Sequence, residues 1–189
     1  MRNPIRWKNL RLRFLPYIAI GLLIAVLHRP SRGALALGLP LVLAGAVLRG
    51  WAAGHLVKND ELATTGPYAH LRHPLYLGTL LVATGFGVCL GGLIAGALLA
   101  GIWPWFGLHY FPRKDRTEAA RLAALHGESF ERYRAAVPAL WPRWRAWRDG
   151  GSDVVWRLER YSDNNELGTL LAIATGICFL TWRAAGGSP

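Results

Sequence analysis

Long apolar runs separated by short polar segments dominate the chain. A membrane-spanning helix needs about 20 consecutive, largely apolar residues. Because such a run can satisfy its backbone hydrogen bonds in lipid only as a helix, each one is predicted to be α-helical. The sequence therefore predicts an all-α, polytopic integral membrane protein. Five segments come close to the required length, and the glycines at 91 and 92 turn the third and fourth into a helical hairpin: 12–28, 34–57, 74–90, 92–110 and 166–182.

The polar stretch 111–165 between the hairpin and the last apolar segment is predicted to have structure of its own. Apolar residues recur at helical spacing over 117–134, which predicts an amphipathic helix that Pro138 and Pro142 stop. Tryptophans and arginines then alternate, which is typical of a segment lying at the membrane interface. These residues are Trp141, Trp144, Trp147 and Trp156 with Arg143, Arg145, Arg148 and Arg157.

The predicted organisation is a single membrane domain, 1–189. Its core, 58–142, holds the polar motifs and the hairpin and includes a cytoplasmic cofactor-binding segment. An interfacial segment, 143–165, and an extra helix, 166–183, follow the core.

Charge sets the expected orientation. The net charge of +11 could indicate nucleic acid, but the basic residues lie beside apolar runs and among nine tryptophans, as at a cytoplasmic membrane face. The first 13 residues carry five Lys or Arg, and no signal-peptide cleavage pattern follows, so a cytoplasmic N-terminus and an anchoring helix are expected. This orientation places the segments 58–73 and 111–165 on the cytoplasmic side. The membrane itself is expected to be an inner or cytoplasmic membrane. The inverted orientation is the alternative.

Metal and hydrolase chemistry find no support in the sequence. The two cysteines, Cys89 and Cys178, lie inside apolar segments, and no Cys/His cluster has zinc spacing. No Gly-x-Ser-x-Gly turn and no phosphate-binding glycine loop are present. We therefore expect neither a metal nor a nucleic-acid partner.

Two polar blocks flank the hairpin instead. The first, 66–78, begins with a Gly-Pro turn and reaches a helix start at Pro74, where backbone amides favour an anion such as a carboxylate. The second, 116–138, follows the hairpin and contributes an acid, a histidine and aromatic rings. Because a hairpin returns the chain to the same membrane face, both blocks are predicted to meet there. Such a site suits a ligand that combines a carboxylate, a cation and a purine.

Both blocks resemble the isoprenylcysteine carboxyl methyltransferase family and the related membrane phospholipid methyltransferases. The first block matches the signature Gly-Pro-Tyr-x-x-x-Arg-His-Pro-x-Tyr-x-Gly over 66–78, and residues 48–52 also look similar. The resemblance covers roughly 42–142. The second block matches at Arg116, Glu118, Leu122, Gly127, Tyr133, Val137, Pro138 and Pro142. It departs from the family where a second Glu, a Phe and a first Tyr are replaced by Ala119, His126 and Phe130.

The resemblance implies an enzyme that uses S-adenosylmethionine. Its cofactor site would use Tyr68, His73, Pro74, Tyr76, Gly78 and Glu118. On physical grounds, His73 and the helix-start amides suit the carboxylate of the cofactor, Glu118 suits an amine or a ribose hydroxyl, and the rings of Tyr76 and Tyr133 suit the sulfonium or the adenine.

The expected acceptor is a lipophilic molecule or lipid-modified chain that arrives from the bilayer and is methylated on a carboxylate or headgroup. N-methyl transfer to an amine is the second possibility. Arg72 or Arg116 would hold an anionic acceptor, and Arg49 is a third candidate because an ionisable group inside an apolar helix is commonly functional.

Two other functions fit part of the sequence. A sterol-type membrane reductase can carry an Arg-His-Pro-x-Tyr-x-Gly segment and would bind NADPH. A non-catalytic membrane scaffold could retain the pocket, and Ala119 in place of the family's second acid is the feature that favours this alternative.

Overall fold

The computed structural model describes residues 28–57, 61–148 and 154–187, and the predicted apolar segment 12–28 lies outside this part except for His28. All regular structure in the described residues is helical, which confirms the all-α prediction. The helices are α2 (Arg32–His55), η3 (Gly66–Ala69), α3 (Pro74–Leu90), α4 (Gly92–Pro104), η4 (Trp105–Tyr110), α5 (Phe111–His126), α6 (Glu128–Ala136), α7 (Leu158–Asp163) and α8 (Glu166–Ala184).

Three helical stretches in the described part are long and apolar enough to cross a membrane: α2, the continuous run Gly92–His126, and α8. The fourth apolar helix, α3, has 17 residues, which corresponds to about 26 Å at ~1.5 Å per residue. The predicted helices at 34–57, 74–90, 92–110 and 166–182 are therefore all present as helices. The described residues do not establish the predicted count of five spans.

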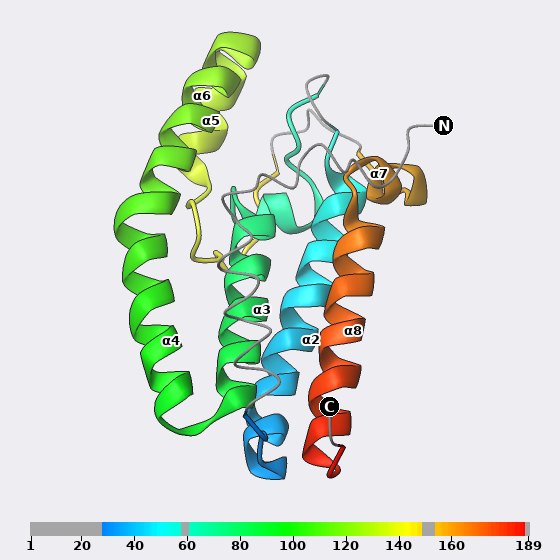
Figure 1. Ribbon diagram of the computed structural model, residues 1–189. Coiled ribbons are helices and arrows are strands. Elements are labelled where there is room, and N and C mark those ends of the chain that lie inside the picture. Colours follow the sequence, from blue (N-terminus) through cyan, green and yellow to red (C-terminus); the bar gives the residue numbers. More distant parts are fainter. Residues whose placement is uncertain (1–27, 58–60, 149–153, 188–189) are drawn as a thin grey trace, which may run out of the picture.

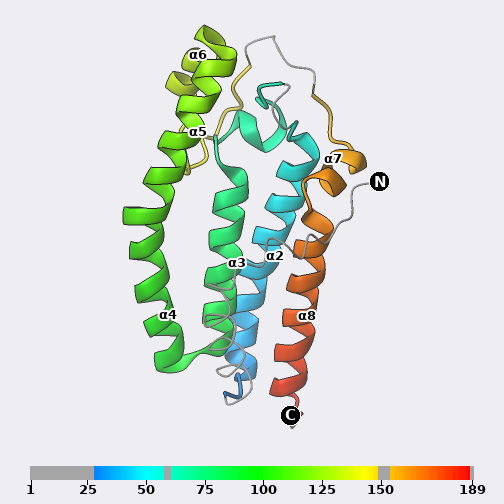
Figure 2. The same cartoon turned by 45° about the horizontal axis from the view of Figure 1, so that its top comes forward.

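Helices α2, α3 and α8 stand side by side, and α4 is set apart on the side of α3 (Figures 1 and 2). Close packing of α2 on α3 depends on two glycine pairs. A Cβ atom on Gly38 would lie 2.5 Å from the carbonyl oxygen of Gly85, and one on Gly45 would lie 2.6 Å from that of Gly78. Small residues at such positions let two helix backbones approach closely, as is common between membrane helices.

The hairpin returns to the site as one long helical run, Gly92–His126, of 35 residues. A proline inside a helix lacks a donor and crowds the preceding turn, and the π-helical turn η4 lies between Pro104 and Pro112. At about 52 Å the run is longer than the ~30 Å apolar core of a bilayer. Its polar second half, α5, therefore extends toward the end of the molecule where the loops gather (Figure 1).

The bounds predicted for the amphipathic helix, 117–134, are wrong. The helix from the hairpin continues to His126, breaks at Gly127, and resumes as α6. Gly127 has φ 52° and ψ −126°, a backbone conformation that glycine adopts far more readily than other residues. The break folds α6 back on α5, so that Phe130, Tyr133 and Val137 pack on Ala119.

The tryptophans of the predicted interfacial segment have different environments. Trp141 and Trp144 are 75% and 97% exposed, and their place at the interface stays a prediction. Trp147 instead packs on Tyr133, with ring centroids 5.2 Å apart. Trp156 donates a hydrogen bond to the carbonyl of Gly50 at the end of α2.

Candidate functional site

The two polar blocks meet at the end of the helical bundle, as the hairpin argument predicted. The amides of Arg72 and His73 donate to the carbonyls of Pro138 and Ala139, at 2.9 and 3.0 Å. Immediately upstream, the carbonyls of residues 69 and 70 accept from the amides of residues 147 and 143, each at 2.9 Å. The first block is therefore held against the chain that follows α6 by a continuous set of backbone hydrogen bonds.

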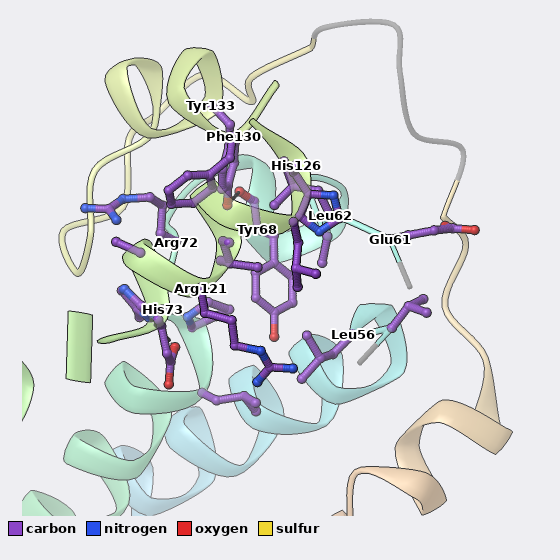
Figure 3. Close-up of a pocket in the computed structure, with 18 of the residues that line it drawn as sticks. Leu56, Glu61, Leu62, Tyr68, Arg72, His73, Arg121, His126, Phe130 and Tyr133 are labelled. Atoms are coloured by element: carbon purple, nitrogen blue, oxygen red, sulfur yellow. Dashed lines mark hydrogen bonds and ion pairs between the residues drawn. The ribbon is translucent and has the colours of Figure 1, made fainter. Parts of the chain in front are cut away.

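A cavity of about 380 Å³ lies beside this junction. Figure 3 shows it between the end of α2, the start of α3 and the facing side of α5. One wall is polar, with Arg72, His73, Tyr76 and Glu118. The other side is largely apolar, and it is lined by Leu56, Leu62, Leu122 and Phe130 among others.

His73 lies between two carboxylates of α5. Its Nε2 is 2.7 Å from Oδ1 of Asp115, and its Nδ1 is 3.5 Å from Oε2 of Glu118. Because an ionised carboxylate can only accept, Nε2 is the atom that carries the proton toward Asp115. The ring also stacks on Tyr76, with centroids 5.3 Å apart and an interplanar angle of 25°. These contacts fix His73, which is only 8% exposed, at the cavity wall.

Arg72 is oriented by the same aspartate. Its Nη1 donates to Oδ1 of Asp115 at 2.9 Å, and its Nε donates to the carbonyl of Val137 at 3.1 Å. Asp115 thus accepts from two neighbouring residues of the first block. This sharing joins α5 to the segment before α3.

Glu118 closes the polar wall. The hydroxyl of Tyr76 donates to its Oε1, and the edge of the Tyr110 ring packs on Tyr76 at 6.0 Å. The side chain of Glu118 remains 41% exposed. It is therefore held by the protein on one side and accessible from the cavity on the other.

Tyr68 and Tyr133 are buried at the base of the cavity. Tyr133 donates its hydroxyl hydrogen to the carbonyl of Tyr68 at 2.8 Å. Burial raises the pKa of both phenols well above the ordinary value. Both hydroxyls are consequently neutral donors over the physiological pH range.

Four amides around the start of α3 are used by the protein itself. Those of Tyr76 and Leu77 both donate to the carbonyl of His73, at 3.1 Å. Those of Arg72 and His73 pair with the chain after α6. These four amides are therefore occupied, and the predicted role of the helix-start amides in anion binding stays a prediction for the amide of Leu75. Side chains are the other groups that can hold an anion in this cavity.

The predicted site residues divide into two groups. Tyr68, Arg72, His73, Pro74, Tyr76, Glu118 and Tyr133 line the cavity together. The three others do not line it. Arg116 is exposed on α5, Gly78 is buried against α2, where a Cβ would lie 2.5 Å from Cγ of Arg49, and Arg49 is paired with Glu166, its Nε 3.1 Å from Oε2.

Two residues of the site, Asp115 and Arg121, were not predicted from the sequence. Asp115 lies one helical turn before Glu118, and this spacing of three could have placed it on the same face of α5. Arg121 lies one turn after Glu118 and extends into the cavity (Figure 3). Ala119, which replaces the family's second acid, is 5% exposed and packs on Phe130 and Tyr133.

No group of three or more His, Cys, Asp or Glu side chains among the described residues is arranged to hold a metal ion. The cavity instead combines one guanidinium from each block with an imidazole, carboxylates and phenols. It can bind an organic ligand that has both charged and apolar parts. In the described part of the chain, three helical stretches long and apolar enough to cross a membrane, with this cavity at one end, define the class of the protein: an integral membrane protein with a ligand pocket where its loops gather.

Comparison with known proteins connects this class to a particular family. The chain is 34% identical over 133 residues to the protein-S-isoprenylcysteine O-methyltransferase of Schizosaccharomyces pombe, covering 68% of this chain and 54% of that protein. It is 32% identical over 120 residues to the human protein of the same name, covering 56% and 40%. It is also 39% identical over 116 residues to the cobalt-zinc-cadmium resistance protein CzcN of Cupriavidus metallidurans, covering 60% and 51%.

These relatives confirm the resemblance to the isoprenylcysteine carboxyl methyltransferase family, to which the chain is therefore related. The chain spans about half the length of the yeast and bacterial relatives and less of the human one. No family model matches the sequence, and no solved structure matches it.

Proposed function

We propose that this protein is an integral membrane methyltransferase that transfers a methyl group from S-adenosylmethionine to a carboxylate of a lipophilic acceptor. The observation that carries the proposal is the cavity in which His73, Tyr76 and Glu118 come together from the two family-like blocks. The relatives named isoprenylcysteine O-methyltransferases support the same chemistry. Their names also support a lipid-modified acceptor.

The donor set of the cavity fits S-adenosylmethionine. The cofactor has an amine, a carboxylate, a sulfonium, ribose hydroxyls and an adenine ring. Glu118 offers a carboxylate to an amine or a hydroxyl, and Arg72 or Arg121 offers a guanidinium to the carboxylate. The ring of Tyr76 suits a sulfonium or a flat heterocycle, and the apolar side formed by Leu122 and Phe130 suits the adenine.

Bound S-adenosylmethionine supplies an electrophilic methyl group. Transfer to a carboxylate requires alignment and a shielded site more than proton transfer, since a carboxylate is already ionised at neutral pH. In this chain the shared contacts to Asp115 fix Arg72 and His73, and the aromatic rings of Tyr76 and Phe111 shield the polar wall. Arg72, with Nε and Nη1 engaged, has Nη2 to orient an anionic acceptor.

The acceptor is expected to come from the bilayer. The cavity lies where α2 ends and α3 begins, beside helices that are apolar enough to span the membrane. An amphiphile can keep its apolar chain among the lipids while its carboxylate reaches the cavity. We assign the site to the cytoplasmic face, as the basic flank before residue 14 favours.

Calorimetry on the purified protein in nanodiscs tests the proposal. S-adenosylhomocysteine should bind, and His73→Ala or Glu118→Gln should weaken binding about tenfold, the usual effect of removing a hydrogen bond to a charged group. Glu128→Gln is the matched control, because Glu128 is exposed on α6 away from the cavity lining. Transfer of labelled methyl groups to a lipid extract then identifies the acceptor class.

The same titration separates the alternatives. Binding of NADPH without binding of S-adenosylhomocysteine would overturn the proposal in favour of a reductase. Binding of S-adenosylhomocysteine without methyl transfer to any lipid or lipidated peptide would favour a scaffold. Binding that His73→Ala and Glu118→Gln leave unchanged would contradict the site assignment.

A further inference from the structure

The C-terminal part of the chain, 154–184, follows the last family-like residue and does not line the cavity. It nevertheless contacts the end of α2 directly and reaches the start of α3 through Arg49. We call this part, which contains the irregular segment 154–157, α7 (Leu158–Asp163) and α8, the C-terminal brace. Figure 1 shows α7 beside the upper end of α2, with α8 running alongside α2.

The brace supplies hydrogen-bond donors to the end of α2. The indole of Trp156 donates to the carbonyl of Gly50, in the last two turns of α2, at 3.1 Å. The amide of Arg157 donates at 3.0 Å to the carbonyl of Gly54, which is among the last carbonyls that have no partner within a helix. A Cβ on Gly54 would lie 2.0 Å from the Trp156 ring, so this contact is tight.

Asn164 adds two contacts at the very end of α2. Its Nδ2 donates to the carbonyls of Ala53 and Leu56, at 2.9 and 3.0 Å. Leu56 and the next residue, Val57, both line the cavity. The direction in which the chain leaves α2, and hence this cavity wall, therefore depends on a side chain more than 100 positions later in the sequence.

Glu166 connects the brace to the start of α3 through Arg49. The Arg49 guanidinium contacts Glu166 with Nε and Nη2, and its Nη1 donates to the hydroxyl of Thr79 at 2.5 Å and to the carbonyl of Leu75 at 3.3 Å. Leu75 lines the cavity next to Tyr76. The side chain of Glu166 is only 6% exposed. A buried carboxylate at this depth requires its partner, because an unpaired charge there is costly.

We propose that Asn164 and Glu166 are positioning residues that hold two walls of the cofactor cavity from outside it. Asn164 fixes the end of α2 at Leu56, and Glu166 fixes the first turn of α3 through Arg49. This inference rests on the proposed function only for the identity of the ligand. Under this inference Arg49 links Glu166 to the first turn of α3 and does not contact the acceptor.

Hydrogen–deuterium exchange on the ligand-free protein tests the positioning directly. Asn164→Ala and Glu166→Gln should each accelerate amide exchange, the first over 53–57 and the second over 74–79. Leu180→Ala is the matched control, because Leu180 is a buried α8 residue that packs on Leu35 and Cys89. It removes α8 packing at the opposite end of the bundle, and it should leave exchange of both segments unchanged.

Binding and kinetics provide the functional measurement. Both variants should weaken binding of S-adenosylhomocysteine about tenfold, within the range that residues acting through others usually produce. KM for S-adenosylmethionine should rise by a similar factor while kcat changes less than about twofold, because the reacting groups themselves remain. Leu180→Ala should lower the melting temperature without changing KM.

The outcomes separate the two proposals. If the unmodified protein fails to bind S-adenosylhomocysteine, the proposed function fails, and the exchange experiment still decides whether the brace positions the cavity. If Asn164→Ala and Glu166→Gln leave exchange at the level of Leu180→Ala, the inference is overturned. Should Glu166→Gln fail to fold, Asn164→Ala, at a partly exposed position, decides the result on its own.

Discussion

The polar residues of the cavity act as linked groups because they share partners. Asp115 accepts from Arg72 and from His73 through the same oxygen, at 2.9 and 2.7 Å. His73 also faces Glu118, which in turn accepts from Tyr76. Moving any one of these side chains therefore changes the geometry of the others. Asp115 joins two residues of the first block to α5.

Asp115→Asn is expected to disturb the site without removing a residue that lines the cavity. The neutral amide oxygen of Asn is a weaker acceptor than an ionised carboxylate, so the two charge-assisted hydrogen bonds from Arg72 and His73 weaken and both side chains are held less firmly. Methyl transfer and binding of S-adenosylhomocysteine should each fall about tenfold or more. Labelled methyl transfer and calorimetry measure the two effects.

Asp163→Asn is the control for this prediction, because Asp163 is exposed at the end of α7. It should leave transfer and binding within about twofold of the unmodified protein, as is usual for exposed sites. Equal behaviour of Asp115→Asn and Asp163→Asn would contradict the proposed role of Asp115.

At this scale the sequence predicted the polar wall of the cavity, while the structure places Arg49 outside the lining. The motif spacing pointed to Arg72, His73, Tyr76 and Glu118, and all of these line one wall. Arg49 is an ionisable residue in an apolar helix, and such residues commonly have a functional role. Its partner, Glu166, lies 117 residues away. Periodicity within one helix carries no information about such a distant contact.

At the scale of the elements, two glycine pairs determine how closely α2 and α3 pack. The pairs Gly38–Gly85 and Gly45–Gly78 place backbone against backbone, and Val42 lies fully buried between them. This contact fixes α3 relative to α2, and the cavity opens where the two helices end and begin. Gly78, predicted to contact the cofactor, thus belongs to the helix contact that supports the cavity.

Gly45→Ala should destabilise the protein, although alanine favours a helix. The new Cβ would lie 2.6 Å from the carbonyl oxygen of Gly78 and 2.8 Å from Val82, so the helices would have to separate. Overpacking of this kind usually costs roughly 1–3 kcal/mol. Thermal unfolding in a fixed detergent should show a clear drop in melting temperature.

Gly96→Ala provides the matched control. Gly96 lies on α4, and nothing lies within 4 Å of the position that its Cβ would take. Alanine there removes backbone entropy from the unfolded chain and should leave stability equal or slightly higher. A drop as large as that of Gly45→Ala would contradict the packing argument.

Helix positions were easier to predict than helix breaks. The apolar runs at 34–57 and 166–182 correspond to α2 (Arg32–His55) and α8 (Glu166–Ala184), within a few residues at each end. The helix over 117–134 was wrong because the apolar spacing continues across Gly127. A single glycine inside such a pattern is often tolerated, and only the fold-back of Phe130 and Tyr133 onto Ala119 shows why this one breaks the helix.

At the scale of the whole molecule, the cavity and the last residues of α8 lie at opposite ends of the bundle. Helix α8 begins at Glu166, beside Arg49 and the loops of the site, and ends at Ala184 near the base of α2 (Figure 2). If α8 crosses the membrane, the cavity and the residues after Ala184 are on different sides. The orientation predicted from the basic N-terminal flank then places the cavity in the cytoplasm.

Cysteine labelling tests this arrangement on the full chain. In a Cys89→Ala, Cys178→Ala background, a cysteine is introduced either as Ser129→Cys on α6 or as Ala185→Cys after α8, both exposed positions. An impermeant maleimide added to intact spheroplasts should label the second protein and not the first, because α6 belongs to the cavity side. After permeabilisation both should react. Labelling of Ser129→Cys alone in intact spheroplasts would establish the inverted orientation, and labelling of both would show that α8 does not cross the membrane.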